Sequence, residues 1–127
     1  MIELCFDSKK CFKAASRGHQ VVIDVPPEKA GDDRGLMPTE IFTTALSACV
    51  GITMVNWLEK HDLKADGLRI SSQMGMSLSP RKIETIKLKI DYPNPLSAEQ
   101  KHELQQTFSS CPVMLSLKNP PAVEISL

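Results

Sequence analysis

Two of the four cysteines stand in sequence contexts that could support chemistry. Cys49 lies among small residues in the segment Leu46–Gly51, so another segment could approach it closely. Cys111 is followed directly by Pro112 and then by apolar residues, which predicts a short helix with Cys111 as its N-cap and proline at the first helical position. A thiol at a helix N-terminus is a good leaving group in thiol–disulfide exchange.

Each context also has a purely structural interpretation. Free cysteine is among the most buried residue types, so Cys49 also fits a core position. It lies 11 positions after Pro38, about 16 Å along a helix, where the helix dipole no longer acts. A reactive Cys49 would therefore need a cation or a hydrogen-bond donor from another segment. Cys111-Pro112 also fits a plain turn.

The other two cysteines, Cys5 and Cys11, fall on the polar face of a predicted N-terminal hairpin. A three-residue loop would place them opposite each other, as a cross-strand disulfide or as two free thiols. We expect both to be dispensable for activity. The sequence has no Cys-x-x-Cys, its three histidines show no ligand spacing to the cysteines, and no phosphate loop is present. We therefore expect neither a metal site nor a bound cofactor.

Composition limits the classes of function. A chain of 127 residues predicts a single domain, residues 1–127. Its 15 basic and 15 acidic residues balance, and aromatic residues make up only 5%. Nucleic acid or an anionic membrane surface would require a basic face, so neither is expected as a partner. The N-terminus lacks the charged and apolar regions of a signal peptide, which predicts a cytoplasmic protein.

A long central helix is predicted from Pro38 to about His61. Proline is favoured at the first helical position, and Glu40 in the first turn suits the positive end of the helix. The segment 41–58 carries no charge, yet Thr, Ser and Asn interrupt it and it is short for a bilayer, so we expect a buried helix and no membrane span. Its apolar residues cover nearly the whole circumference. A chain of this length could hardly surround such a helix alone, so we expect a homodimer.

Strands and shorter helices complete an α+β pattern. Alternation predicts strands in the first 12 residues, at 19–25, and at 68–77 and 86–92, with a loop at 26–35. Ser97 with Gln100 forms a capping box that begins a second helix. Alternating Val123, Ile125 and Leu127 predict a final edge strand.

Together these segments resemble the OsmC/Ohr family. The resemblance is carried by the segments 38–42, 45–49, 111–113 and 119–121 with Leu117, and the order of elements extends it over nearly the whole chain. It implies the OsmC-like α+β fold, in which antiparallel sheets wrap around long central helices in an intertwined dimer. It also implies thiol-dependent reduction of hydroperoxides, without metal or bound cofactor.

The resemblance assigns roles to the two central cysteines. Cys49 would be the peroxidatic thiolate, which attacks the peroxide and becomes a sulfenic acid. Cys111 would then condense with it to a disulfide. An external dithiol, lipoyl or thioredoxin-like, would reduce that disulfide.

One position departs from the organic-hydroperoxide branch of the family, where an acidic residue directly follows the helix-opening proline and pairs with an arginine beside the thiolate. Here Thr39 occupies that position and Glu40 comes one residue later, about 100° around the helix. The pattern therefore resembles the broader OsmC-like branch. Arg17 is the candidate cation for the thiolate, although it also fits a solvated turn beside Gly18. Glu40 fits either an active-site role or a first-turn role.

Two other functions stay open on the sequence alone. One is a non-enzymatic OsmC-like dimer that binds an apolar ligand, and the other is a thiol redox sensor or sulfur carrier. For the enzyme, we expect a cleft beside Cys49 with apolar walls from Phe42, Leu46 and Met114. Such a cleft would favour alkyl hydroperoxides over hydrogen peroxide, with weaker activity than in the organic-hydroperoxide branch.

Overall fold

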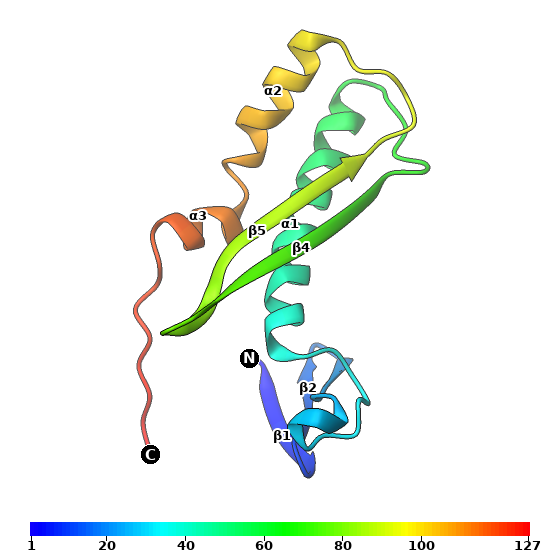
Figure 1. Ribbon diagram of the computed structural model, residues 1–127. Helices are drawn as coiled ribbons and strands as arrows, with labels where there is room; N and C mark the ends of the chain where they lie inside the picture. Colours follow the sequence, from blue (N-terminus) through cyan, green and yellow to red (C-terminus); the bar gives the residue numbers. More distant parts are fainter. The chain divides into compact units, whose positions relative to one another are not determined.

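The computed structural model describes all residues, 1–127 (Figure 1). The chain forms two compact units, Met1–Phe42 and Thr43–Leu127. Helix α1 (Pro38–Lys60) begins in the first unit and continues in the second, and it ends within one residue of the predicted end. Each unit is described by itself below.

The first unit is a three-stranded antiparallel sheet. Strands β1 (Glu3–Ser8), β2 (Cys11–Ser16) and β3 (His19–Ile23) pair in the order β1-β2-β3. Phe6 lies opposite Phe12, with their rings edge to face and centroids 5.7 Å apart. β3 stops two residues earlier than predicted, because Asp24 turns inward to bind the following loop.

The prediction for Cys5 and Cys11 is wrong in two respects. Cys5 pairs with Lys13, and Cys11 pairs with Ser8, so the two thiols are not opposite each other. Cys11 is also buried, with 1% of its surface exposed, whereas Cys5 is exposed. The cause is a β-bulge between Phe6 and Ser8, which shifts the register next to a short turn. No disulfide joins them, and both are free thiols.

The loop between β3 and α1 is held by the buried carboxylate of Asp24. It accepts hydrogen bonds from the backbone N–H groups of Val25, Asp32 and Arg34, at 2.8 to 3.2 Å. Burial acts to raise the pKa of Asp24, but these three donors outweigh it and the net pKa is lowered. The loop includes one short 3-10 helix, η1 (Pro27–Lys29), in the segment predicted to be irregular.

The second unit begins with most of α1, which lies against a two-stranded antiparallel ribbon (Figure 1). β4 (Arg69–Leu78) pairs with β5 (Arg81–Asp91). β5 begins five residues before the predicted start, because Ser79-Pro80 alone makes the turn. Alternate ribbon residues, including Ile70, Ile86 and Leu88, pack toward the buried face of α1.

Two further helices follow the ribbon. α2 (Ala98–Phe108) begins with the predicted capping box, in which the Ser97 hydroxyl accepts from the Gln100 N–H and the Gln100 side chain accepts from the Ser97 N–H. α3 (Pro112–Lys118) begins as predicted, with Cys111 as N-cap and Pro112 as the first residue. The core of this unit consists of two clusters of buried residues, one with Met54, Trp57, Leu58 and Leu104 and one with Leu46, Val50 and Cys111.

The predicted final edge strand is not formed. Residues 119–127 belong to no strand, and Val123 and Ile125 are 79% and 87% exposed. A strand requires hydrogen bonds from a neighbouring strand, and no strand of this chain pairs with the tail. Apolar residues alternate in this tail, but no strand of the same chain offers an edge with which the tail could pair.

Only one face of α1 is covered. Its buried residues lie on one side and include Leu46, Val50 and Met54, whereas Ile52 on another side is 63% exposed. By length and composition α1 could cross a membrane, a test that core helices of soluble proteins also pass, and 33% of its most apolar stretch is buried in the chain. The opposite face of α1, which includes Ile52, is therefore open in the single chain.

Candidate functional site

Cys49 and Cys111 lie together in the second unit. Their side chains share a hydrogen bond, and both belong to the apolar cluster around Leu46 and Val50. Cys111 is buried, while Cys49 is partly exposed. The structure thus brings together two thiols that are 62 positions apart in the chain.

Local structure explains how the two thiols meet. Cys49 follows one turn after Leu46 on α1 and lies beside the buried face of that helix. The Cys111 N–H donates to the Phe108 carbonyl at 3.2 Å, which turns the chain from α2 into α3. Since Pro112 has no N–H, the first N–H of α3 belongs to Val113, and it donates to the sulfur of Cys49.

The electrostatic environment keeps Cys49 protonated. Burial raises the pKa of the Cys49 thiol above its ordinary value, and the hydrogen bond with Cys111 raises it further. The N–H of Val113 acts in the opposite direction but is outweighed. None of the groups that set this pKa is a cation. A thiolate at Cys49 therefore requires a positive charge that the second unit does not place beside it.

The surroundings of the two thiols are apolar. Leu46 and Met114, both expected as cleft walls, pack in the cluster that contains Cys49. The third expected wall, Phe42, belongs to the first unit and is 44% exposed. Sequence reasoning did not identify Val113, although its place as the second residue of a proline-opened helix was a usable signal.

Arg17 and Glu40 both lie in the first unit. Arg17 occupies the exposed turn between β2 and β3, where its φ of 51° is left-handed. Glu40 accepts a hydrogen bond from the Met37 N–H at 2.7 Å, so its carboxylate caps the start of α1. This contact gives Glu40 the first-turn role that its position suggested.

The structure holds no group of three or more His, Cys, Asp or Glu side chains that could bind a metal ion. Cys5 and Cys11 both lie in the first unit, so the paired thiols of the second unit do not include them. The chemistry that the second unit can support is therefore that of a dithiol.

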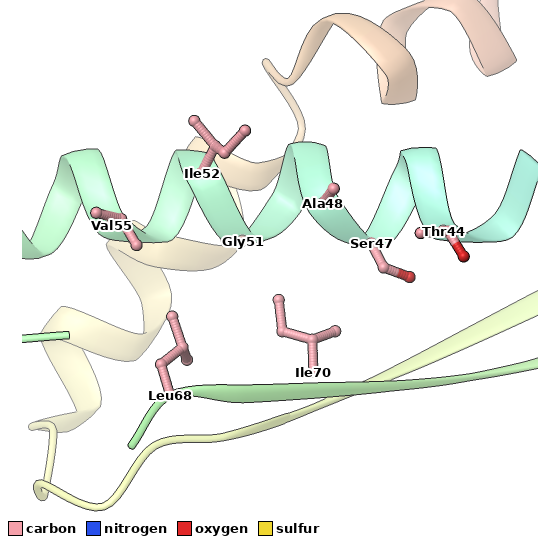
Figure 2. A pocket seen from close by; sticks show the side chains of 8 residues that line it. All are labelled: Thr44, Ser47, Ala48, Gly51, Ile52, Val55, Leu68 and Ile70. Carbon is pink, nitrogen blue, oxygen red and sulfur yellow. The ribbon is translucent and has the colours of Figure 1, made fainter. Parts of the chain in front are cut away.

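An open apolar groove of about 530 Å³ runs along α1, and sequence reasoning did not identify it. Figure 2 shows Leu68 and Ile70 pointing from the ribbon side toward α1. The helix contributes mostly small side chains: Thr44, Ser47, Ala48, Gly51, Ile52 and Val55. Cys49 does not line this groove, which therefore differs from the expected cleft beside the thiol. The signal was the recurrence of small residues at helical spacing.

The chain is similar to known proteins both in sequence pattern and in fold. A family model described as OsmC-like protein matches residues 31–126. No curated protein sequence matches the chain. The similar solved structures described below have at most 19% sequence identity to this chain, so they show the fold alone.

Three of these structures illustrate the likeness. A protein of Psychrobacter arcticus 273-4, described as induced by osmotic stress and in the detoxification response, has a TM-score of 0.85 at 17% identity, covering 91% of this chain and 85% of its own. An OsmC-like protein from Mycoplasma pneumoniae has 0.77 at 19% identity, covering 94% and 87%. The organic hydroperoxide resistance protein OhrB of Bacillus subtilis has 0.64 at 17% identity, covering 94% and 92%.

Proposed function

Since this chain belongs to the OsmC-like protein family, we propose that it is a cysteine-based peroxidase that reduces organic hydroperoxides through Cys49 and Cys111. The observation that carries the proposal is the hydrogen bond between the two thiols within one apolar cluster. Two proteins of similar fold, from Legionella pneumophila and Bacillus subtilis, are named for organic hydroperoxide resistance, which supports the class of substrate.

The proposed reaction consumes two thiols. The Cys49 thiolate attacks the terminal oxygen of the hydroperoxide, the O–O bond breaks, and the alcohol leaves after it takes up a proton. Cys49 is then a sulfenic acid. The Cys111 sulfur attacks the Cys49 sulfur, water leaves, and a disulfide forms. An external dithiol, lipoyl or thioredoxin-like, reduces the disulfide and is itself oxidised.

The proposal requires a cation near Cys49, because burial and Cys111 raise the pKa of that thiol. Arg17 remains the candidate for this role. Glu40 also remains a candidate active-site residue. Any such role would come in addition to its hydrogen bond with the Met37 N–H.

We propose that the active form is an intertwined homodimer in the cytoplasm, built from one OsmC-like domain per chain, residues 1–127. The groove on α1 supports the dimer, because its small side chains allow a second helix to approach closely and its exposed Ile52 would otherwise stay in water. The second copy supplies the cover that α1 lacks in the single chain.

The test is a peroxidase assay with an alkyl hydroperoxide and dithiothreitol, on the wild type beside Cys49→Ser. Turnover by the wild type and its loss in Cys49→Ser support the proposal. Equal peroxide consumption by both proteins would contradict it. Cys5→Ser serves as the matched control, because Cys5 is a free exposed thiol of the first unit.

One observation favours a second function: the chain has an apolar groove, and Cys49 does not line it. In that case the protein is a non-enzymatic dimer that binds an apolar ligand. Such a protein would bind a fluorescent fatty acid equally well as wild type and as Cys49→Ser, and would consume no peroxide. A thiol redox sensor or sulfur carrier, the remaining alternative, would form the disulfide without multiple turnovers.

A further inference from the structure

The ribbon of β4 and β5 concentrates positive charge in a chain whose net charge is zero. Residues 69–91 contain five basic and only two acidic side chains, Glu84 and Asp91. Figure 1 shows the ribbon against α1, so only its other face is turned away from that helix. The charge of the ribbon is therefore displayed on its outer face.

The strand register fixes which side chains share that outer face. Arg69 lies opposite Asp91, Ser71 opposite Lys89, and Gln73 opposite Lys87. All six residues are exposed, and they alternate with the inward residues of the same strands. Arg69, Lys89 and Lys87 thus form a row of cations along the ribbon.

This row is largely unneutralised. Lys89 pairs with Asp91 at 3.0 Å, but neither Arg69 nor Lys87 makes an ion pair. Three cations of the first unit are neutralised by contrast, since Lys13 and Arg34 both pair with Asp7 and Lys9 pairs with Asp32. The outer face of the ribbon therefore keeps charge that a partner could neutralise.

We propose that this outer face binds an extended acidic segment of a partner protein, with carboxylates at alternate positions. Alternate residues of a strand are about 6.6 Å apart, so such a segment repeats at the same spacing as Lys87 and Lys89. Ser71 lies opposite Lys89 and Gln73 opposite Lys87, so their side chains can donate hydrogen bonds to the same carboxylates. Nucleic acid fits less well, because the row offers few phosphate contacts and no aromatic side chain for stacking.

The experiment measures the anisotropy of two fluorescein-labelled peptides of the same composition, one with alternating Glu and Ser and one with a Glu block followed by a Ser block. We expect the alternating peptide to bind more tightly, and Lys87→Glu with Lys89→Glu to weaken its binding by about tenfold or more. Lys64→Glu with Lys101→Glu is the matched control, because both lysines are exposed and lie off the ribbon. We expect it to change binding by less than about twofold.

Equal binding of the two peptides would overturn the proposal, and so would equal losses in the two double variants. Tighter binding of a single-stranded oligonucleotide or of phosphatidylserine vesicles would also overturn it and assign the face to another class of partner. Circular dichroism checks that each variant is folded. Peroxide turnover with dithiothreitol should be the same in both double variants, which separates this inference from the proposed peroxidase.

Discussion

The thiol of Cys49, in the middle of α1, shares a hydrogen bond with the thiol of Cys111 at the start of α3. This relationship predicts different roles for the two sulfurs. Cys49→Ser should abolish peroxide consumption, lowering kcat/KM by about a thousandfold or more, because a serine hydroxyl cannot replace a thiolate. The decrease is followed by peroxide loss in a stopped-flow assay.

Replacement of Cys111 should have another outcome. Cys111→Ser should still form one sulfenic acid at Cys49, because the peroxidatic sulfur remains, but no disulfide can follow within the chain. Mass spectrometry after labelling with dimedone should detect that sulfenic acid in Cys111→Ser and little of it in the wild type. If the two proteins were labelled alike, Cys111 would have no part in the reaction.

The pKa of Cys49 predicts the pH dependence of the proposed peroxidase activity. Because this pKa is raised above its ordinary value of 9.0, the thiolate fraction should still increase with pH at 9. Without a cation beside Cys49, as expected for Arg17→Ala, the rate of Cys49 oxidation should therefore rise through this range without a plateau. A plateau at or below neutral pH would instead show that a cation, with Arg17 as the candidate, lowers the pKa in the active form. Comparison with Arg17→Ala distinguishes the two outcomes.

The same pKa has a consequence for stability. A group whose folded pKa is raised contributes stability below its unfolded pKa, and that contribution is lost as the pH rises through the folded value. The free energy of unfolding of the wild type should therefore fall at alkaline pH, and that of Cys49→Ser should fall less. Urea denaturation at neutral pH and at pH 10 measures this difference.

Asp24 predicts the opposite behaviour in acid. Its pKa is lowered by three backbone N–H donors, so its stabilising effect is present above the unfolded pKa and is lost as the pH falls through the folded one. Asp24→Asn should lower Tm at neutral pH and reduce the further loss below pH 4. Asp33→Asn is the control, because Asp33 lies in the same loop and is exposed. An unchanged Tm in Asp24→Asn would show that the loop does not depend on this carboxylate.

The open face of α1 predicts how the proposed dimer can be broken. Ile52 lies in the groove and is exposed in the single chain, so an aspartate there would be buried without a partner at the helix–helix interface of the proposed dimer. Ile52→Asp should raise the dimer Kd by about a hundredfold or more. Sedimentation velocity measures the change, and Gln105→Asp on the exposed side of α2 is the matched control. A stable wild-type monomer at micromolar concentration would remove the dimer altogether.

Local signals in the sequence predicted the elements that depend on few neighbours. Pro38 set the start of α1, and Ser97 with Gln100 set the start of α2, because capping is decided within one turn of the chain. The pattern at Cys111-Pro112 likewise predicted α3.

Features that depend on distant segments could not be predicted in the same way. The bulge after Phe6 decides the register of Cys11, and a residue pattern alone does not reveal a bulge. Val123 and Ile125 alternate like strand residues, but strand formation depends on a neighbouring edge. The groove on α1 is lined by Gly51 and Ile70, which pack so closely that a Cβ added to Gly51 would lie 3.2 Å from the Ile70 side chain. Contact between two residues so far apart in the chain depends on tertiary packing, which the residue pattern does not reveal.

The apolar cluster around the thiols predicts the selectivity of the proposed peroxidase. Burial of an alkyl chain contributes about 0.8 kcal/mol per methylene, so four methylenes would raise kcat/KM by about two-hundredfold over hydrogen peroxide. Met114 lies in this cluster, whereas Leu115 on the same helix is exposed. Met114→Ser should therefore reduce the rate with a long-chain alkyl hydroperoxide and leave the rate with hydrogen peroxide nearly unchanged. Leu115→Ser should change neither rate. Equal rates for the two oxidants in the wild type would show that the cluster around Cys49 does not bind the alkyl chain.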